Sequence, residues 1–296
     1  MSVEKIGQDE WVEEAAAQRE QLGWRGRALE RLGATNPLLI AGILLLAAVL
    51  VPLLTSNEYF IRVAGNVCLF ALLALGLNVV VGAGLLDLGY VAFFGIGGYG
   101  YAMLSSAQFG LHLPTWLSIP LVVVLTALFG LLLGLPSLRL AGDYLAIVTL
   151  GFGQIFVLLA NSMSRVSVPW SEQQLDLTGG PNGITNLDPI RLFGLRLSGV
   201  AGHFYLLLAA LALVWLALHN TNRSRVGRAW RALREDALAA EAMGMPVRRL
   251  KLLAFAIGAA VAGLSGSVFA AWQTAVFPTN FDLTLLIAIY AMVVLG

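Results

Sequence analysis

Long apolar stretches, separated by short polar ones, run along most of this chain after a polar start. A helix rises 1.5 Å per residue, so about 20 apolar residues cross the roughly 30 Å hydrocarbon core of a bilayer. The pattern therefore predicts an all-α, polytopic bundle of transmembrane helices with about eight spans. The apolar segments are Pro37–Leu54, Ile61–Val81, Leu88–Ser105, Trp116–Leu135, Tyr144–Ala160, Phe204–Leu218, Leu252–Trp272 and Leu283–Leu295.

The composition agrees with a membrane protein. Hydrophobic residues make up 58% of the chain and charged residues 12%, whereas soluble domains carry roughly 25% charged residues. The net charge of +1 gives no reason to expect nucleic acid as a partner. The one cysteine, Cys68, lies in an apolar segment, so we expect neither a disulfide framework nor a cysteine metal site.

Polar residues of mixed charge fill positions 1–36, which we assign to an N-terminal tail, and residues 37–296 form the transmembrane domain. A cleavable signal would place an apolar core near its start, and this tail has none. Two interpretations of Glu10–Leu32 stay open. It is either an amphipathic helix on the membrane surface, anchored by Trp11 and Trp24, or a solvated helical tail without a function.

Basic residues indicate the orientation, because loops rich in Lys and Arg face the cytoplasm. With a cytoplasmic N-terminus, fourteen of the 18 basic residues lie inside, namely five in the tail, Arg139, and eight in Thr221–Lys251. The four basic residues left outside are Arg62, Arg165, Arg191 and Arg196. This asymmetry predicts that every segment before Thr221 crosses the membrane.

The last apolar segment is short. The residues after Asp282 give only about 21 Å of helix, less than the bilayer core. No basic or aromatic flank follows before Gly296. We therefore expect membrane helix to continue past Gly296, and the C-terminus of the chain to be truncated.

Residues 161–202 form the longest polar stretch apart from the tail, and the predicted orientation places them on the periplasmic side. Turn-forming residues crowd its centre. Both a tight cap permitted by glycines and a plain surface loop stay open. The candidate residues are Thr178, Gly179, Gly180, Pro181, Asn182 and Gly183.

Seven glycines and one carboxylate fall within Gly82–Ala102, at the depth of a membrane segment. Each glycine weakens a helix by roughly 1 kcal/mol relative to alanine, so this segment is expected to be a helix broken by glycine. Discontinuous helices of this kind line substrate paths in transporters. Two simpler alternatives are close helix packing at the glycines and an N-cap role for Asp87.

A second polar set interrupts Leu138–Ile155, where Asp143 precedes an apolar helix and is a predicted N-cap. Gln154 is costly in a bilayer unless it bonds to a neighbouring helix or faces water. Either a helix contact or a place in the path explains it. The candidate path residues are Asp87, Gly89, Tyr90, Phe93, Gly95, Tyr99, Thr149 and Gln154.

Small residues recur every four positions in Leu252–Trp272. One ridge holds Ala259, Gly263 and Ser267, and a second holds Gly258, Ala262 and Gly266. Small residues let helix backbones approach closely. The two ridges predict close packing on two sides of this helix, within or between subunits.

The stretch Thr221–Lys251 carries eight of the 18 basic residues between two apolar segments. Its centre is rich in Ala, Leu, Glu and Arg, which favour helix, and Gly244 and Pro246 are stop residues. We predict a cytoplasmic loop with one short helix across Arg231–Met243 that docks a partner. Gly244 is expected to adopt a left-handed conformation at the helix end.

Enzymatic activity on this chain is not expected. The sequence has no G-x-x-x-x-G-K-[ST] phosphate loop, no G-x-S-x-G, no H-E-x-x-H and no Cys/His cluster. The three histidines are scattered in loops or at segment ends.

Long motifs give the chain a family resemblance over residues 37–296. GLLDLGYVAFFGIGGYGYA, LRLAGDYLAIVTLGFGQI, LTGGPNGI and GRAWRALREDALAAEAMGMPVRRLKLLAFAI resemble the permease subunit of bacterial ABC importers for branched-chain amino acids. The resemblance implies inward transport of Leu, Ile and Val across the bacterial inner membrane. It also implies two cytoplasmic ATPase subunits, a second permease subunit, a periplasmic or lipid-anchored binding protein, and contact with membrane lipid. No cofactor is implied on this chain, since ATP and Mg belong to the partner ATPase.

Residues 220–251 resemble the coupling loop of importer permeases, whose pattern is E-A-A-x-x-x-G. Here Leu238 stands in place of the Glu, and the family often has Glu where this chain has Gln154. The residues that the resemblance assigns to ATPase coupling are Arg234, Glu235, Asp236, Leu238, Ala239, Ala240, Glu241 and Gly244.

Two alternative functions stay open. Permeases for urea or short amides share the coupling loop and the overall layout. A secondary transporter or channel without an ATPase partner would usually show intramembrane carboxylates or a charged relay. This chain has Asp87 and Asp143, both near segment ends.

Overall fold

The computed structural model describes residues 37–55, 57–106, 110–137, 143–164, 166–167, 174–188, 190–192, 195–196 and 199–295. The predicted amphipathic helix Glu10–Leu32 lies outside the described residues. The chain divides into two units, Met1–Leu54 and Thr55–Gly296. The described part of the first unit is one apolar helix, α3, at Pro37–Leu54.

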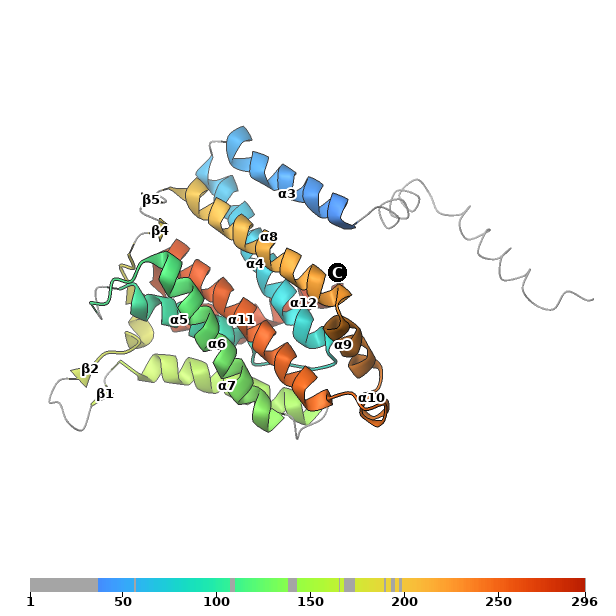
Figure 1. The fold of residues 1–296 in the computed structure, drawn as a ribbon. Helices are drawn as coiled ribbons and strands as arrows, with labels where there is room; N and C mark the ends of the chain where they lie inside the picture. The colour runs from blue at the N-terminus through green and yellow to red at the C-terminus, as the bar shows by residue number, and fades with distance from the viewer. Residues whose placement is uncertain are drawn as a thin grey trace, which may run out of the picture. The chain divides into compact units, whose positions relative to one another are not determined.

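The second unit is built almost entirely from helices (Figure 1). They are α4 Glu58–Gly82, α5 Tyr90–Leu104, α6 Thr115–Ser137, α7 Asp143–Ser162, α8 Val200–Arg223, α9 Arg225–Glu235, α10 Ala237–Ala242, α11 Val247–Gln273 and α12 Leu283–Leu295. Each of the eight predicted apolar segments is a helix, which confirms the all-α class. Six helices of the described chain are long and apolar enough to cross a membrane, and the apolar helices Gly42–Leu54 and Tyr90–Leu104 are shorter.

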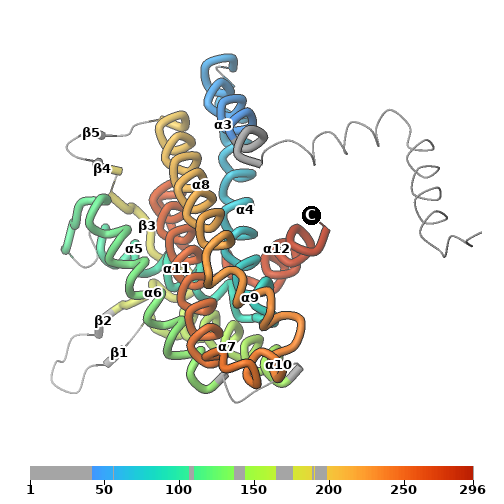
Figure 2. The backbone as a smooth tube through the Cα atoms, turned by 45° about the vertical axis from the view of Figure 1, so that its right-hand side comes forward, coloured from blue at the N-terminus to red at the C-terminus, as the bar shows by residue number. Residues whose placement is uncertain are grey.

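Helix α11 packs against α5, α6 and α4, and it lies in the middle of the second unit (Figure 2). The predicted small-residue ridges make this possible. A Cβ on Gly263 would lie 2.6 Å from the Thr126 Cβ of α6, and one on Gly258 would overlap Val80 of α4. Both ridges therefore serve packing within this chain. Seventeen residues of α11 are buried, which is more than in any other helix of the described chain.

Helix α5 runs without interruption from Tyr90 to Leu104, so the prediction of a helix broken by glycine is wrong. Its glycines lie where neighbouring helices approach. A Cβ on Gly97 would overlap the Gly263 backbone of α11, and one on Gly95 would overlap the Phe156 ring of α7. The close contacts that glycine allows offset its low helix propensity.

Apolar side chains cover the outer faces of α6 and α7. Leu128 and Leu132 are exposed on α6, and Ile147, Ile155 and Leu158 are exposed on α7. Patches of this kind are rare on soluble monomers and normal against lipid. The outward faces thus have the chemistry that a bilayer requires.

Short strands and 3-10 turns close one end of the helices. Residues Ile184–Thr185 (β3) pair with Ala275–Val276 (β6), which joins the polar stretch 161–202 to the connection after α11. The remaining elements are β1 Val166–Ser167, β2 Gln174–Leu175, β4 Arg191–Leu192, β5 Leu195–Arg196, η1 Gly180–Asn182 and η2 Pro278–Phe281.

Candidate functional site

The basic stretch folds as two helices rather than one, so the predicted single helix Arg231–Met243 is wrong. Helix α9 ends at Glu235 and α10 begins at Ala237. Between them Asp236 has an extended backbone, and its Oδ1 accepts hydrogen bonds from the amides of Leu238 at 2.8 Å and Ala239 at 3.0 Å. Asp236 therefore acts as the N-cap of a new helix.

The predicted left-handed conformation of Gly244 is confirmed, with φ at +81°. The Gly244 amide donates to the Glu241 carbonyl at 2.9 Å, and the Met245 amide donates to the Ala240 carbonyl at 3.1 Å. These two bonds form a Schellman motif, which ends a helix and satisfies its last carbonyls. Helix α10 is therefore closed at both ends by its own sequence.

Helix α10 presents two apolar side chains to the outside. Leu238 is 80% exposed and Met243 is 82% exposed, while Ala240 between them is buried. The Ala239 and Glu241 side chains are also exposed. Large apolar groups at such exposure are unusual when they lie together on one small helix. We call the exposed surface formed by Leu238, Ala239 and the C-cap residue Met243 the α10 knob.

Helix α9 fixes this knob to the bundle. Its buried stripe consists of Gly227, Trp230 and Leu233, and the Trp230 Nε1 donates to the Leu250 carbonyl of α11 at 3.0 Å. Trp230 is only 3% exposed. This buried indole hydrogen bond joins α9, which leads into α10, to α11.

The end of α9 also meets the connection between α4 and α5, residues 83–89. Gly84 has φ at +76°, and a Cβ there would lie 3.0 Å from the Arg234 Cα. The side chains of Arg234 and Glu235 themselves are exposed. The predicted coupling residues therefore touch the chain segment that leads into α5.

Asp87 lies in this connection and is 1% exposed. One alternative made Asp87 the N-cap of α5. That alternative is wrong, because the N-cap position belongs to Gly89. Instead its Oδ1 accepts from the Gly89 amide at 2.9 Å, and Tyr290 of α12 donates to the Asp87 carbonyl at 2.8 Å. Burial raises the pKa of the Asp87 carboxyl to about 7, although the hydrogen bond from Gly89 lowers it.

Two polar atoms near Asp87 lack partners among the described residues. The Asp87 Oδ2 and the Tyr90 hydroxyl are both buried without a hydrogen bond. A buried polar group without a partner costs about 1–3 kcal/mol, so such atoms are few in native structures and commonly mark a site where a water, an ion or a ligand group binds.

Thr149 of α7 binds the connection at residues 83–89, which α9 also contacts. Its Oγ1 accepts from the Leu88 amide at 2.9 Å and donates to the Ala146 carbonyl at 3.1 Å. A Cβ on Gly89 would overlap the Thr149 carbonyl. Gln154, five positions further on, is exposed and has no hydrogen bond within the described chain. The structure thus brings Thr149 to Asp87 and leaves Gln154 apart.

Aromatic rings fill the boundary between α5, α7 and η2. The ring centroids of Phe93 and Phe152 are 5.8 Å apart, and those of Tyr99 and Phe156 are 6.2 Å apart. Phe281 of η2 lies 5.9 Å from Tyr99 and 6.0 Å from Phe156. We call these five residues the aromatic seam. The Tyr99 hydroxyl in the seam is buried and without a partner among the described residues.

The sequence analysis missed three members of the seam, namely Phe152, Phe156 and Phe281. Phenylalanine is ordinary in an apolar span and in the turn before one, so its presence there carries no functional signal. The predicted path residues Tyr90, Phe93 and Tyr99 are all buried, at 0%, 2% and 4% exposure. These three residues therefore lie inside the packed helices, and their place on a path stays a prediction.

The stretch around Thr178–Gly183 is a tight cap permitted by glycines, as one of the two alternatives predicted. Gly179, Gly180 and Gly183 all have positive φ. The Asp176 Oδ1 accepts from the Gly179 amide, and the Thr178 Oγ1 accepts from the Gly180 amide at 3.3 Å. Pro181 and Asn182 complete the η1 turn, which contacts α7 and η2. The cap therefore lies against the elements that carry the aromatic seam.

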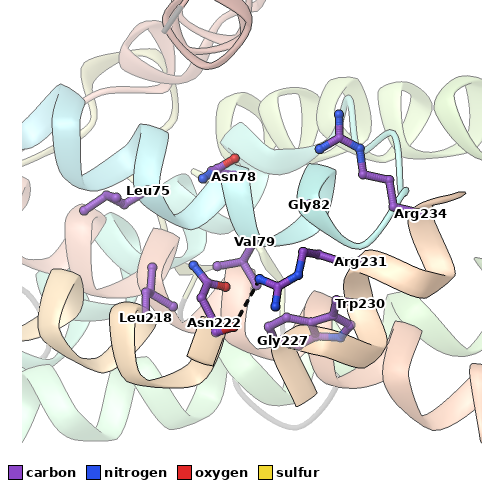
Figure 3. Close-up of a pocket in the computed structure, with 10 residues that line it drawn as sticks. All are labelled: Leu75, Asn78, Val79, Gly82, Leu218, Asn222, Gly227, Trp230, Arg231 and Arg234. Atoms are coloured by element: carbon purple, nitrogen blue, oxygen red, sulfur yellow. Dashed lines mark hydrogen bonds between the residues drawn. The ribbon is translucent and has the colours of Figure 1, made fainter. Parts of the chain in front are cut away.

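A pocket of about 240 Å³ opens where α4, α8 and α9 meet. Figure 3 shows Arg231 reaching across it toward Asn222, whose carbonyl accepts from the guanidinium at 3.3 Å. The residues that line the pocket are Leu75, Asn78, Val79, Gly82, Leu218, Asn222, Gly227, Trp230, Arg231 and Arg234. Within the described residues no three His, Cys, Asp or Glu side chains gather as a metal site would need.

Comparison with known proteins places the chain in a family. Residues 59–296 match the family described as branched-chain amino acid transport system, permease component. The chain is 41% identical over 278 residues to the high-affinity branched-chain amino acid transport system permease protein LivM of Escherichia coli K12. The protein of the same name from Salmonella typhimurium is 42% identical over 278 residues.

A more distant relative is the probable branched-chain amino acid transport permease protein LivM of Methanocaldococcus jannaschii, 27% identical over 220 residues. The two bacterial alignments cover 86% of this chain and 62% of each relative, and the archaeal one covers 69% and 60%. The chain thus spans about three fifths of the length of these relatives. No solved structure matches the chain.

Proposed function

This chain belongs to the family of branched-chain amino acid transport permease components, and on that premise we propose that it is the membrane-spanning permease subunit of an ATP-binding cassette importer. It moves Leu, Ile and Val inward by alternating access. The relatives described above are branched-chain amino acid permeases, which favours the amino-acid branch over a permease for urea or short amides.

The observation that carries the proposal is the α10 knob. Leu238 and Met243, at 80% and 82% exposure, form an apolar projection on a helix that is capped at both ends. The sequence has no phosphate loop, so a separate chain must hydrolyse ATP. A rigid knob on a short helix suits a groove in that chain. A secondary transporter or channel would have no use for it.

The connection at residues 83–89 supports a mechanical link from the knob to the path. Arg234 rests on Gly84, and Thr149 holds Leu88. A push on α10 therefore reaches the start of α5 and the α7 contact through packed backbone. We propose that this movement separates α5 from α7 and opens the aromatic seam.

The seam has the chemistry for a weakly binding path. Its rings give an apolar wall for an aliphatic side chain, and the unpartnered Tyr99 hydroxyl offers one hydrogen bond. A passage must release what it binds, so few polar contacts favour flux. Asp87 Oδ2 and the Tyr90 hydroxyl provide a second polar point along the same helix.

The full assembly belongs to the proposal too. Two ATPase subunits dock on the knob side, a second permease subunit completes the passage, and a periplasmic or lipid-anchored binding protein delivers the amino acid on the side of the Thr178–Gly183 cap. The basic loop then faces the cytoplasm. An impermeant thiol reagent applied to intact cells should fail to label a cysteine introduced at the exposed Glu241. Ready labelling would reverse this orientation.

Uptake of radiolabelled leucine by proteoliposomes that contain the whole importer tests the function. ATP-dependent uptake of Leu, Ile and Val is expected, and uptake of urea is not. In Gly244→Val the β-branched residue strains the left-handed C′ position, so we expect loss of ATP-driven uptake with normal membrane abundance. Gly110→Val is the matched control, because Gly110 also has positive φ and open space around it. Equal uptake in both variants would contradict a coupling role for α10.

A further inference from the structure

The pocket between α4, α8 and α9 lies at the polar end of two candidate spans. Helix α4 ends at Gly82 and α8 ends at Arg223, and both are apolar over their lengths. The pocket walls run from Gly82 down to Leu75, which is about 10 Å along a helix axis. This distance covers the step from the headgroup layer into the hydrocarbon. The pocket therefore lies at the depth of the lipid headgroups.

The walls of the pocket change character along this depth. Leu75, Val79 and Leu218 form the deeper, apolar part. Asn78, Asn222, Arg231 and Arg234 give the polar part, and all four are exposed. A molecule that filled this pocket would need an apolar portion and an anionic portion joined end to end.

The arginines of the pocket lack acidic partners. No carboxylate pairs with Arg231 or Arg234 within the described part of the chain, and Glu235 is the one acidic residue of α9. Arg228, Arg231 and Arg234 each directly follow a residue of the buried stripe of α9. They are therefore held at the edge where α9 meets the bundle, and among the described residues no carboxylate pairs with them.

We propose that this pocket is a binding site for the phosphate group of an anionic phospholipid. The guanidinium groups of Arg231 and Arg234 bind the phosphate oxygens, since arginine matches phosphate with two parallel hydrogen bonds. The Asn78 and Asn222 side chains bond the glycerol portion, and the acyl chain lies along Leu75, Val79 and Leu218. Basic pockets between membrane helices recognise anionic headgroups in this way. The site is separate from the proposed amino-acid path and does not depend on it.

A bound lipid here would join α9 to α4 and α8. The pocket contains Trp230, whose indole bonds to α11, and it contains Arg234, whose backbone touches Gly84. Occupancy would therefore stiffen the attachment of the α10 knob to the bundle.

Native mass spectrometry of the whole chain in mild detergent tests the site, with equal amounts of phosphatidylglycerol and phosphatidylcholine. We expect retention of phosphatidylglycerol and not of phosphatidylcholine. The double variant Arg231→Gln with Arg234→Gln should weaken that binding about 30-fold, from the usual strength of two arginines near anionic lipid. A lysine pair at the same positions keeps the charge but loses the paired hydrogen bonds, and about a fivefold loss is expected.

The matched control is Arg248→Gln with Arg249→Gln, which removes the same charge from exposed residues at the start of α11. It should leave phosphatidylglycerol retention unchanged. An equal loss in both double variants would mean diffuse attraction to the basic surface and would overturn the pocket. Thermal unfolding of all variants checks that the fold is intact.

Two further arms identify the source of the phosphate. Inorganic phosphate at millimolar concentration, or glycerophosphoglycerol without acyl chains, should fail to displace the lipid. Displacement by either would show a site for soluble anions and overturn the lipid assignment. If the pocket variant keeps its lipid but no longer co-purifies with ATPase subunits, the arginines bind a protein partner and the proposal is wrong.

Discussion

Helix α5 is held by α11 and by α7 in different ways. On the α11 side backbone meets backbone, since a Cβ on Gly97 would overlap Gly263 and a Cβ on Gly266 would overlap the Phe94 carbonyl. On the α7 side, once α5 has begun, a glycine meets a ring, since a Cβ on Gly95 would overlap the Phe156 side chain, and backbone is met at Gly89, the residue before α5. A backbone cannot move aside without shifting its helix, whereas a ring can rotate away.

This difference separates a fixed contact from an adjustable one. Of the residues in the apolar span of α11, 61% are buried, whereas 22% are buried in the span of α7. The α5–α11 pair therefore behaves as a rigid unit, because close-packed backbones transmit strain and do not absorb it. Helix α7 is attached by the aromatic seam and by Thr149, so we expect α7, rather than α11, to change position during transport.

The largest effect on stability is expected from a substitution at the fixed contact, between α5 and α11. Gly266→Val places a branched side chain against the Phe94 carbonyl and the Gly98 amide. Overpacking against backbone costs about 3 kcal/mol or more, so the protein should be nearly absent from the membrane. Membrane abundance and thermal unfolding in detergent measure this. Gly151→Val is the control, because Gly151 lies in α7 with no atom within 4 Å of its Cβ position. Similar losses in both would remove the distinction between the two contacts.

The contact between α5 and α11 was largely predictable from the sequence. Apolar length gave the eight helices, and the four-residue spacing of small residues gave the two packing ridges of α11. The interruption predicted in α5 was wrong, because the free energy of close packing outweighs the propensity cost of about 1 kcal/mol per glycine. Propensity also failed at Asp236, where good helix formers stand on both sides and one capping carboxylate starts a new helix.

The contact between α5 and α7, which is the adjustable one, was much less predictable. Thr149 was identified because it interrupts an apolar helix face, and Tyr99 because it lies in the glycine-rich segment; both lie where α5 meets α7. Phe152, Phe156 and Phe281 were not, since only the tertiary structure brings them together. The same holds for the lipid pocket, whose arginines come from one helix and whose asparagines come from two others.

A paired substitution at Gly95 tests whether the α7 contact can adjust. Gly95→Leu alone should cost about 1–3 kcal/mol by pressing on the Phe156 ring. Adding Phe156→Ala makes room for the new side chain, so the double variant should cost clearly less than the sum of the singles. Thermal unfolding gives the coupling, and leucine uptake per folded molecule gives the effect on transport. Additive costs would mean that the ring is as fixed as the backbone on the α11 side. Uptake that falls only in proportion to abundance would remove the seam from the path.

Asp87 lies in the connection at residues 83–89, which leads from α4 into α5. Its carboxyl is expected to make the stability of the protein depend on pH. Its pKa rises from a usual value near 3.8 to about 7 in the folded protein. The folded state therefore binds more protons than the unfolded state between about pH 4 and pH 7, so stability falls as the pH rises through this range and stays low above it. Asp87→Asn should remove this dependence and be more stable than the wild type by up to about 4 kcal/mol at pH 8. Thermal unfolding at pH 5 and pH 8 measures it. An equal pH dependence in the variant would show that another group is responsible.

The smallest effect should come from Thr149, where one hydrogen bond holds α7 to residues 83–89. Thr149→Val keeps the shape of the side chain but leaves the Leu88 amide without its acceptor at 2.9 Å. An unsatisfied amide costs about 1–2 kcal/mol. The matched control is Thr126→Val, since the buried Thr126 hydroxyl donates to the Val122 carbonyl within its own helix. If α7 is the adjustable element, Thr149→Val should loosen it and alter the leucine uptake rate per folded molecule, while Thr126→Val changes stability by less and uptake not at all. Hydrogen exchange at the Leu88 amide reports the loosening directly. Unchanged exchange and uptake in Thr149→Val would mean that the seam alone holds α7, and that α9 acts on α5 without passing through this bond.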